Sequence, residues 1–160
     1  MTVTIRAATP QDVPGIRKLL VETWHHTYDL TMGPEKVTEI TDSWHSLERL
    51  EAQALGTGAF LVALRDGALL GTSLASRDDD GVVWLRRLYI KPAAQGTGLG
   101  QRLLAETETL LPLRAIRLEV EPENARAIRF YERAGFVILQ RQSACGDQPL
   151  PALLMEKARP

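Results

Sequence analysis

Three glycines within five residues form the segment of this chain whose chemistry is most directly readable. They lie in the run Gln95–Gln101, after an apolar stretch that ends in Leu88-Tyr89-Ile90 and before an amphipathic stretch. Glycine allows turns that aim several backbone N–H groups at one point, and the N-terminus of a helix favours an anion. The order strand, glycine-rich turn and helix therefore predicts a phosphate-binding site.

The spacing of the glycines argues against two common nucleotide-binding motifs. Gln101 follows the third glycine, which departs from the G-x-G-x-x-G of a dinucleotide-binding turn, and three predicted antiparallel strands precede the turn. A P-loop has Lys-Ser/Thr after its last glycine, where this chain has Gln101-Arg102. The pattern that remains is Gln-x-x-Gly-x-Gly, formed by Gln95, Gly98 and Gly100.

A second motif follows across one further predicted strand. It reads Asn124-x-x-Ala127-x-x-x-Tyr131 and is followed by Gly135-Phe136. Together the two motifs resemble the GCN5-related N-acetyltransferase (GNAT) family over about residues 82–137. The resemblance implies that acetyl-CoA is the cosubstrate, with its pyrophosphate on the glycine turn and its pantetheine arm along the preceding strand. The cofactor-binding residues that it implies are Leu88, Tyr89, Ile90, Gln95, Gly96, Thr97, Gly98, Leu99, Gly100, Gln101, Asn124 and Tyr131.

The resemblance also implies two catalytic residues. Tyr131 would protonate the departing coenzyme A thiolate, and Glu119 matches the glutamate base of ribosomal-protein N-terminal acetyltransferases, which carry a similar Leu-Glu-Val strand. Other readings of the same residues stay open. Tyr131 could be a core tyrosine, Asn124 is also a good helix N-cap, and Glu119 could pair with Arg117 while a water chain serves as the base. Arg102 and Arg133 could bind the phosphates of coenzyme A, or they could equally be solvated surface residues.

The acceptor side carries weaker signals. Trp24 and Tyr28 lie where the first helices of the family form the acceptor pocket, so we expect them to bind substrate, although helical spacing also suits Trp24 to the core. The pattern Glu-Thr-x-x-x-Thr-Tyr and the tail from Gly146 to Met155 resemble bacterial spermidine/spermine acetyltransferases. Arg86 departs from that subgroup, which can carry an acid there, and its positive charge disfavours a polycation.

The composition narrows the class of protein. With 160 residues and a net charge of −1, the chain predicts one N-acetyltransferase domain over 1–160 with no basic excess for nucleic acid or anionic lipid. No apolar stretch is long enough to span a membrane, and the N-terminus lacks the apolar core of a signal peptide, so we expect a cytoplasmic protein. The single Cys145 is expected to be a bystander thiol, and the acidic run Asp78–Asp80 a solvated turn, so no metal site is predicted.

Hydrophobic spacing and turn signals predict a mixed α/β fold. The helices are expected from Pro10 to about His26 and over 34–41, 46–55, 99–111 (ended by Pro112) and 125–134. Residues 27–45 are expected to be less regular, with the Gly33-Pro34 break before the short helix over 34–41. The strands are expected over residues 3–7, 59–65, 69–77, 82–90, 114–121, 136–142 and 150–157. The fold class is therefore a single-domain GNAT fold: a mixed, mostly antiparallel sheet with splayed central parallel strands and flanking helices.

The predicted activity is transfer of acetyl from acetyl-CoA to a primary amine by direct attack, with a small-molecule amine or polyamine as acceptor. Three alternatives remain: a protein or peptide N-terminus as acceptor, a coenzyme A-binding sensor without catalysis, and a Rossmann-type oxidoreductase. The oligomeric state, including a homodimer, is left open.

Overall fold

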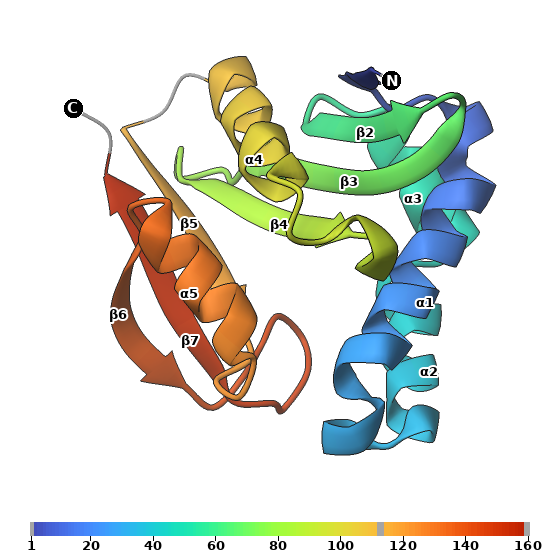
Figure 1. Cartoon of the computed structure of the whole chain (residues 1–160). Helices are drawn as coiled ribbons and strands as arrows, with labels where there is room; N and C mark the ends of the chain where they lie inside the picture. Colours follow the sequence, from blue (N-terminus) through green and yellow to red (C-terminus); the bar gives the residue numbers. More distant parts are fainter. Residues whose placement is uncertain (1, 112–113, 159–160) are drawn as a thin grey trace. The chain divides into compact units, whose positions relative to one another are not determined.

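The computed structural model describes residues 2–111 and 114–158 (Figure 1). Its elements, in chain order, are β1 (Val3–Ala7), η1 (Pro10–Asp12), α1 (Val13–Met32), α2 (Pro34–Trp44), α3 (Leu47–Ala54), β2 (Ala59–Arg65), β3 (Ala68–Arg77), β4 (Val83–Ile90), η2 (Pro92–Ala94), α4 (Leu99–Leu110), β5 (Ala115–Val120), α5 (Ala125–Arg133), β6 (Val137–Gln142) and β7 (Ala152–Ala158).

The strands form one mixed sheet in the order β1-β2-β3-β4-β5-β7-β6. Antiparallel pairing joins β1 to β2, β2 to β3, β5 to β7 and β6 to β7. The pairing of β4 with β5 is parallel and short, with Val83 opposite Ile116 and Trp84 opposite Arg117. The predicted fold class, a mixed and mostly antiparallel sheet with flanking helices, is confirmed.

Contacts divide the chain into two compact units. The first unit consists of residues 1–75 and 87–110, and the second consists of 76–86 and 111–160. Each unit is described by itself below. The assignment of the whole chain to one domain stays a prediction.

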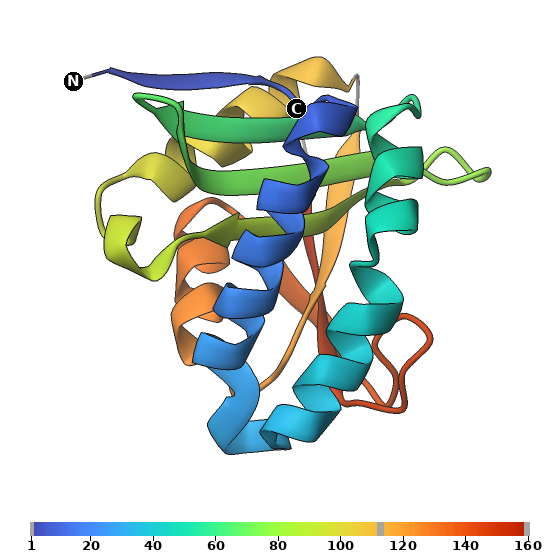
Figure 2. The same ribbon diagram turned by 90° about the vertical axis from the view of Figure 1, so that its right-hand side faces the viewer.

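In the first unit, helices cover both faces of β2 and β3. On one face, α1 and α3 bury a core with the strands: Ala8, Val13, Ile16, Leu20, Leu50, Phe60, Val62 and Leu74. Side chains alternate along a strand, so the residues between these point to the opposite face, where Ser73 meets Thr107 of α4. Figure 2 shows α1 to α3 in front of the strands and α4 behind them.

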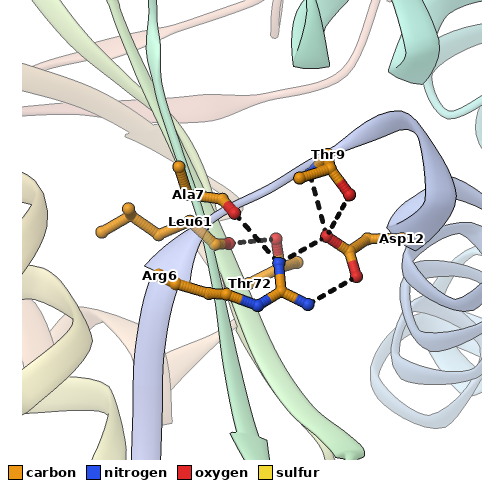
Figure 3. Close-up of polar contacts among 6 residues, drawn as sticks. All are labelled: Arg6, Ala7, Thr9, Asp12, Leu61 and Thr72. Atoms are coloured by element: carbon orange, nitrogen blue, oxygen red, sulfur yellow. Dashed lines mark hydrogen bonds and ion pairs between the residues drawn. The ribbon is translucent and has the colours of Figure 1, made fainter.

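The passage from β1 into α1 is held by a small polar network (Figure 3). Arg6 donates two hydrogen bonds to the carboxylate of Asp12, at 2.7 and 2.9 Å, and the pKa of Asp12 falls to about 2, chiefly because of these bonds. The backbone N–H and the hydroxyl of Thr9 donate to the same carboxylate, at 2.8 and 3.1 Å. The Thr-Pro-Gln-Asp signal therefore starts a helix as predicted, with the 3-10 turn η1 as its first turn. Nearby, the Thr72 hydroxyl donates to the carbonyl of Leu61, at 2.7 Å, and links β3 to β2.

Helix α1 is longer than predicted. It runs through the segment that was expected to be irregular and ends only at Gly33, whose φ of 89° is left-handed. Two local contacts within the helix support the extension. Tyr28 is buried against Trp24, with ring centroids 4.6 Å apart, and the Thr27 hydroxyl donates to the carbonyl of Thr23. Helix α2 likewise continues past the predicted end at residue 41, to Trp44.

The other helix boundaries agree closely with the prediction. The hydroxyl of Ser46 caps α3 by accepting from the N–H of Arg49, at 3.2 Å. Pro112, which was expected to end α4, lies outside the described residues. No helix among the described residues is both long and apolar enough to cross a bilayer.

In the second unit, β5 alternates as predicted. Ile116, Leu118 and Val120 are buried, whereas Arg117 and Glu119 point to the opposite face and are only partly buried. This alternation decides which β5 side chains can reach solvent or a ligand.

Candidate active site

The glycine-rich turn joins β4 to α4 through η2. Gly96 and Gly98 have left-handed φ angles of 78° and 84°, and α4 begins at Leu99. Gln95 donates through Nε2 to the carbonyl of Ile90, at 3.0 Å, and Thr97 donates through its hydroxyl to the carbonyl of Ala94, at 2.6 Å. These bonds tie the turn back to the end of β4.

Backbone conformation explains the first two glycines. A Cβ added at Gly96 or Gly98 would meet no atom within 4 Å, so the left-handed φ, rather than crowding within the chain, favours glycine there. Gly100 is not among the left-handed residues and lies in the first turn of α4. The first N–H groups of a helix have no partner within it, and the helix dipole favours an anion there. The residues at 96–100 therefore fit a pyrophosphate group.

The end of β4 is packed on both faces. A Cβ at Gly71 would lie 2.7 Å from Cδ1 of Ile90 and 3.1 Å from the carbonyl oxygen of Tyr89, so a side chain at this position would crowd the end of β4. The N–H of Lys91 donates to the carbonyl of Leu70, at 2.8 Å. Leu88, Tyr89 and Ile90 are all half-buried. Their backbone is thus held rigidly next to the glycine turn.

The two predicted substrate-binding residues lie in an aromatic cluster with Trp44, His45 and Tyr89 of β4. The ring of Trp24 lies 4.6 Å from Tyr28, 5.7 Å from Trp44, 6.0 Å from His45 and 6.4 Å from Tyr89, between ring centroids. Both Trp24 and Tyr28 are 6% exposed, so they also have the core character that helical spacing allowed.

Of the two histidines in the same segment, His26 is exposed and His25 is partly buried. His25 contacts Asp29 through Nδ1, at 2.6 Å, and the hydroxyl of Thr38 through Nε2, at 3.3 Å.

The structure adds two buried polar residues that the sequence reasoning missed, His45 and Arg87. Burial is the main cause that lowers the pKa of His45 to about 3, followed by the positive charges of Arg87, Arg17 and Arg49. Burial also lowers the pKa of Arg87 to about 10, against an opposing effect of Tyr89. The alternation of β4 was a usable signal for Arg87, since it follows buried Val83 and Leu85 at a spacing of two. No pattern pointed to His45.

In the second unit, Glu119 has an environment suited to a base. Burial raises its pKa, while a hydrogen bond from the N–H of Gly146 and the charge of Arg86 act in the opposite direction. Arg117 pairs with Glu156, with Nε 2.6 Å from Oε2. The alternative in which Glu119 is paired with Arg117 is therefore wrong.

Helix α5 presents the second motif. The side chain of Asn124 accepts from the N–H of Ala127, at 3.2 Å, so the N-cap role is confirmed. Tyr131 is 9% exposed, and its ring meets Phe130 and Phe136 edge to face, with centroids 5.2 and 5.5 Å apart. The ring therefore packs inward as expected, and this packing alone does not decide between a structural and a catalytic tyrosine.

Cys145 and the acidic turn Asp78–Asp80 have local contacts that do not point to catalysis or metal binding. The pKa of Cys145 rises to about 11, mainly because of burial and then because of nearby acidic groups, so its thiol stays protonated. Asp78 pairs with Arg86, and Asp80 accepts from the N–H of Val82. Within residues 2–111 and 114–158, no group of three or more His, Cys, Asp or Glu could hold a metal ion.

Comparisons with known proteins agree with the motifs. The sequence profile of the Acetyltransferase (GNAT) family matches residues 16–136. An uncharacterized N-acetyltransferase of Mycobacterium tuberculosis is 34% identical over 111 residues, which cover 67% of this chain and 71% of the relative. The spermidine N(1)-acetyltransferase of Thermoplasma acidophilum is 26% identical over 150 residues, covering 86% and 90%.

Solved structures show the same fold. The PaiA N-acetyltransferase from Thermoplasma acidophilum in complex with coenzyme A has a TM-score of 0.87 at 24% identity, covering 99% of this chain and 100% of that one. The ribosomal-protein-S18-alanine N-acetyltransferase from Escherichia coli has a TM-score of 0.72 at 18% identity, covering 98% and 94%.

Proposed function

This chain belongs to the GNAT family of acetyltransferases, and we propose that it moves the acetyl group of acetyl-CoA to a small primary amine by direct attack. It is an N-acetyltransferase with acetyl-CoA as its cosubstrate. The observation that carries the proposal is the glycine turn, in which two left-handed glycines lead straight from the end of β4 into α4.

The donor is proposed to bind along the first unit. Backbone N–H groups from Gly96 to Gly100 would hold the pyrophosphate, helped by the dipole of α4. The backbone of Leu88–Ile90 would pair with the pantetheine arm like an additional strand. An N–H near Leu88 would stabilise the negative charge that develops on the thioester oxygen during attack.

The chemistry needs one base and one acid. The amine nitrogen forms a bond to the carbonyl carbon while the carbon–sulfur bond breaks. Glu119 takes the proton that the amine gives up, and its raised pKa suits that role, while a water chain is the alternative base. Tyr131 gives its proton to the departing thiolate and recovers one from solvent. No residue is acylated on this route.

A second class of acceptor is a protein or peptide N-terminus. The observation in its favour is the strand Leu118-Glu119-Val120, whose glutamate matches the base of ribosomal-protein N-terminal acetyltransferases. The spermidine acetyltransferase among the relatives instead favours a small amine. One assay distinguishes these two classes of acceptor.

That assay measures release of the coenzyme A thiol from acetyl-CoA with polyamines, amino acids, aminoglycosides and N-terminal peptides, with mass spectrometry of the products. We expect acceptor-dependent release with a small amine. Binding of acetyl-CoA without release for any acceptor would point to a sensor, and binding of NADH in its place would point to an oxidoreductase. A Gly100→Glu variant serves as the control deficient in donor binding.

A further inference from the structure

Arg87 is a buried cation without an anionic partner. Its Nε and Nη2 atoms each expose less than 1 Å² and have no hydrogen-bond partner, and the residue is 6% exposed. Its guanidinium lies 5.1 Å from the centroid of the Phe60 ring. No carboxylate among the described residues forms an ion pair with it. A buried, unpaired guanidinium is costly, and its groups can only donate.

Neighbouring groups add to this surplus of donors. The Nε1 atom of Trp24, the Nδ1 atom of His45 and the hydroxyl of Thr23 are also buried without a partner. The ring of Trp24 lies 6.0 Å from that of His45, and the charge of Arg87 acts on His45. We call Thr23, Trp24, His45 and Arg87 the donor cluster. Two of its members, Trp24 and Arg87, can only donate, whereas the Thr23 hydroxyl and the neutral His45 ring can donate or accept, so donors outnumber acceptors in the cluster.

The charges around the donor cluster also favour an anionic ligand. Arg17 and Arg49 also act on His45 as positive charges, and Arg17 already donates to the carbonyls of Thr41 and His45, at 3.2 and 2.7 Å. Arg17 is paired with Asp42, at 2.8 Å, whereas no carboxylate among the described residues forms an ion pair with Arg87 or Arg49, so the potential around the donor cluster stays positive. A cationic group would be repelled there, and an anion would be attracted.

We propose that the donor cluster binds a carboxylate of the acceptor, so that the acceptor is a free amino acid or a similar small amine with a carboxylate, not a polyamine. A carboxylate offers about four acceptor sites and can take two parallel bonds from one guanidinium. Arg87 directly precedes Leu88–Ile90, the strand end assigned to the donor. A carboxylate held there places the amine of the same molecule beside the acetyl group, and this placement rests on the proposed function.

The binding requires one local rearrangement. The donor atoms each expose less than 1 Å², so a neighbouring side chain must move when the carboxylate reaches them. Trp24 is one of these donors and packs on Tyr28 and Tyr89. Its fluorescence should therefore change on ligand binding, which gives a readout independent of turnover.

The test uses pairs of acceptors that differ only in the carboxylate: ornithine against putrescine, and phenylalanine against phenethylamine. We expect kcat/KM for at least one amino acid to exceed that of its decarboxylated partner by about tenfold or more, in line with the loss of one charged hydrogen bond. Arg87→Met should remove this ratio, and Arg87→Lys should restore part of it. Arg65→Met, which removes an exposed positive charge at the end of β2, should leave the ratio unchanged. Equal values for both partners, a preference for the amines, or an unchanged ratio in Arg87→Met would overturn the proposal.

Two further measurements separate this proposal from the proposed function. Calorimetric binding of ornithine and putrescine to the protein with coenzyme A tests the carboxylate site without turnover. Binding that depends on Arg87, without acetyl transfer, would support the carboxylate site and refute the proposed transfer. Acetyl transfer without a preference for carboxylates would support the proposed function and refute the carboxylate site. Arg87→Met should unfold at the same or a higher temperature, since it removes a buried unpaired charge. A marked fall in Tm, seen also in Arg87→Gln, would instead make Arg87 a structural residue and overturn the proposal.

Discussion

Arg117 on β5 pairs across the sheet with Glu156 on β7, and its Nε atom lies 2.6 Å from the carboxylate. Glu119 points to the same face of β5 but is not the partner of that arginine. Its pKa is raised because burial outweighs the hydrogen bond from Gly146 and the charge of Arg86. A carboxylate tuned in this direction accepts a proton more readily near neutral pH than one held in an ion pair.

Replacing Glu119 by Gln should lower kcat/KM at neutral pH by about 100-fold, if a single general base is lost. Because the pKa of Glu119 is raised, the wild-type rate should fall on the acid side at a pH above the ordinary range of a glutamate. A profile of kcat/KM against pH measures both effects. An acid limb that persists unchanged in Glu119→Gln would assign the base to another group.

Glu156→Gln gives the matched control. It removes one carboxylate from the same sheet face and releases Arg117, which can then act on Glu119. A nearby positive charge favours the ionised form, so the acid limb should move to lower pH. A shift in the opposite direction would contradict this coupling.

Tyr131→Phe should lower kcat by about 100-fold to 10,000-fold with little change in the KM for acetyl-CoA. The phenylalanine ring keeps the edge-to-face packing on Phe130 and Phe136, so the Tm should change little. Steady-state kinetics and a thermal melt of the same sample distinguish a catalytic acid from a residue that only packs in the core. An unchanged kcat would leave Tyr131 as a packing residue.

Local signals were sufficient to predict most of the elements. Ser46 and Asn124 were predicted as N-caps and form cap hydrogen bonds in the structure. The end of α1 was not predictable in this way, since His, Thr and Tyr are only moderate helix formers. The Trp24 ring packs on Tyr28 one turn along α1 and also contacts Trp44 and Tyr89 from other elements, and these last two contacts depend on the tertiary structure.

The sequence predicted only the part of the candidate site that contains the two motifs. Gly96 and Gly98 need left-handed angles that few other residues adopt, so the turn proposed to bind the donor could be recognised in the sequence. His45 and Arg87 left little trace, because a polar residue becomes significant only when the fold buries it. The acceptor side is accordingly the part for which sequence reasoning was least informative.

Gly100→Glu should weaken acetyl-CoA binding by at least tenfold, about 1.4 kcal/mol. The position has no left-handed φ, so the backbone accepts a side chain, while the new charge opposes a pyrophosphate at the start of α4. Ala105→Glu adds the same charge at an exposed position of the same helix and should leave the Kd unchanged. Titration calorimetry measures the Kd of acetyl-CoA for each variant, and equal affinities for both variants would refute the assignment of the pyrophosphate to the glycine turn.

Thr107→Val should destabilise the fold by about 1–3 kcal/mol, since it strips a buried hydroxyl of its partner. The Thr107 hydroxyl donates to the carbonyl of Leu103, so Ser73 donates to Thr107 across 2.8 Å. Adding Ser73→Ala to this variant should cost little more, because both polar groups are then gone. Urea unfolding of the single and double variants measures the coupling, and Thr109→Val at an exposed position should lie within about 0.5 kcal/mol of wild type. Strictly additive losses would contradict the pairing.

His45 should make the stability of the protein depend on pH in a defined window. Its pKa is lowered to about 3 in the folded state from an ordinary value of 6.5, so between these values the unfolded chain binds more protons. Stability is therefore complete above about pH 6.5 and decreases as the pH falls. At pH 5 the loss is about 2 kcal/mol, from about 1.5 pH units at 1.36 kcal/mol each.

The measurement compares wild type with His45→Phe, which keeps a ring against Trp24. Urea unfolding at pH 7, 6 and 5 should show the free energy of unfolding declining more steeply in wild type than in the variant. Carboxyl groups titrate in both proteins and cancel from the difference between the two curves. Parallel curves would mean that His45 can take up a proton in the folded state, through a partner or through solvent that reaches its ring.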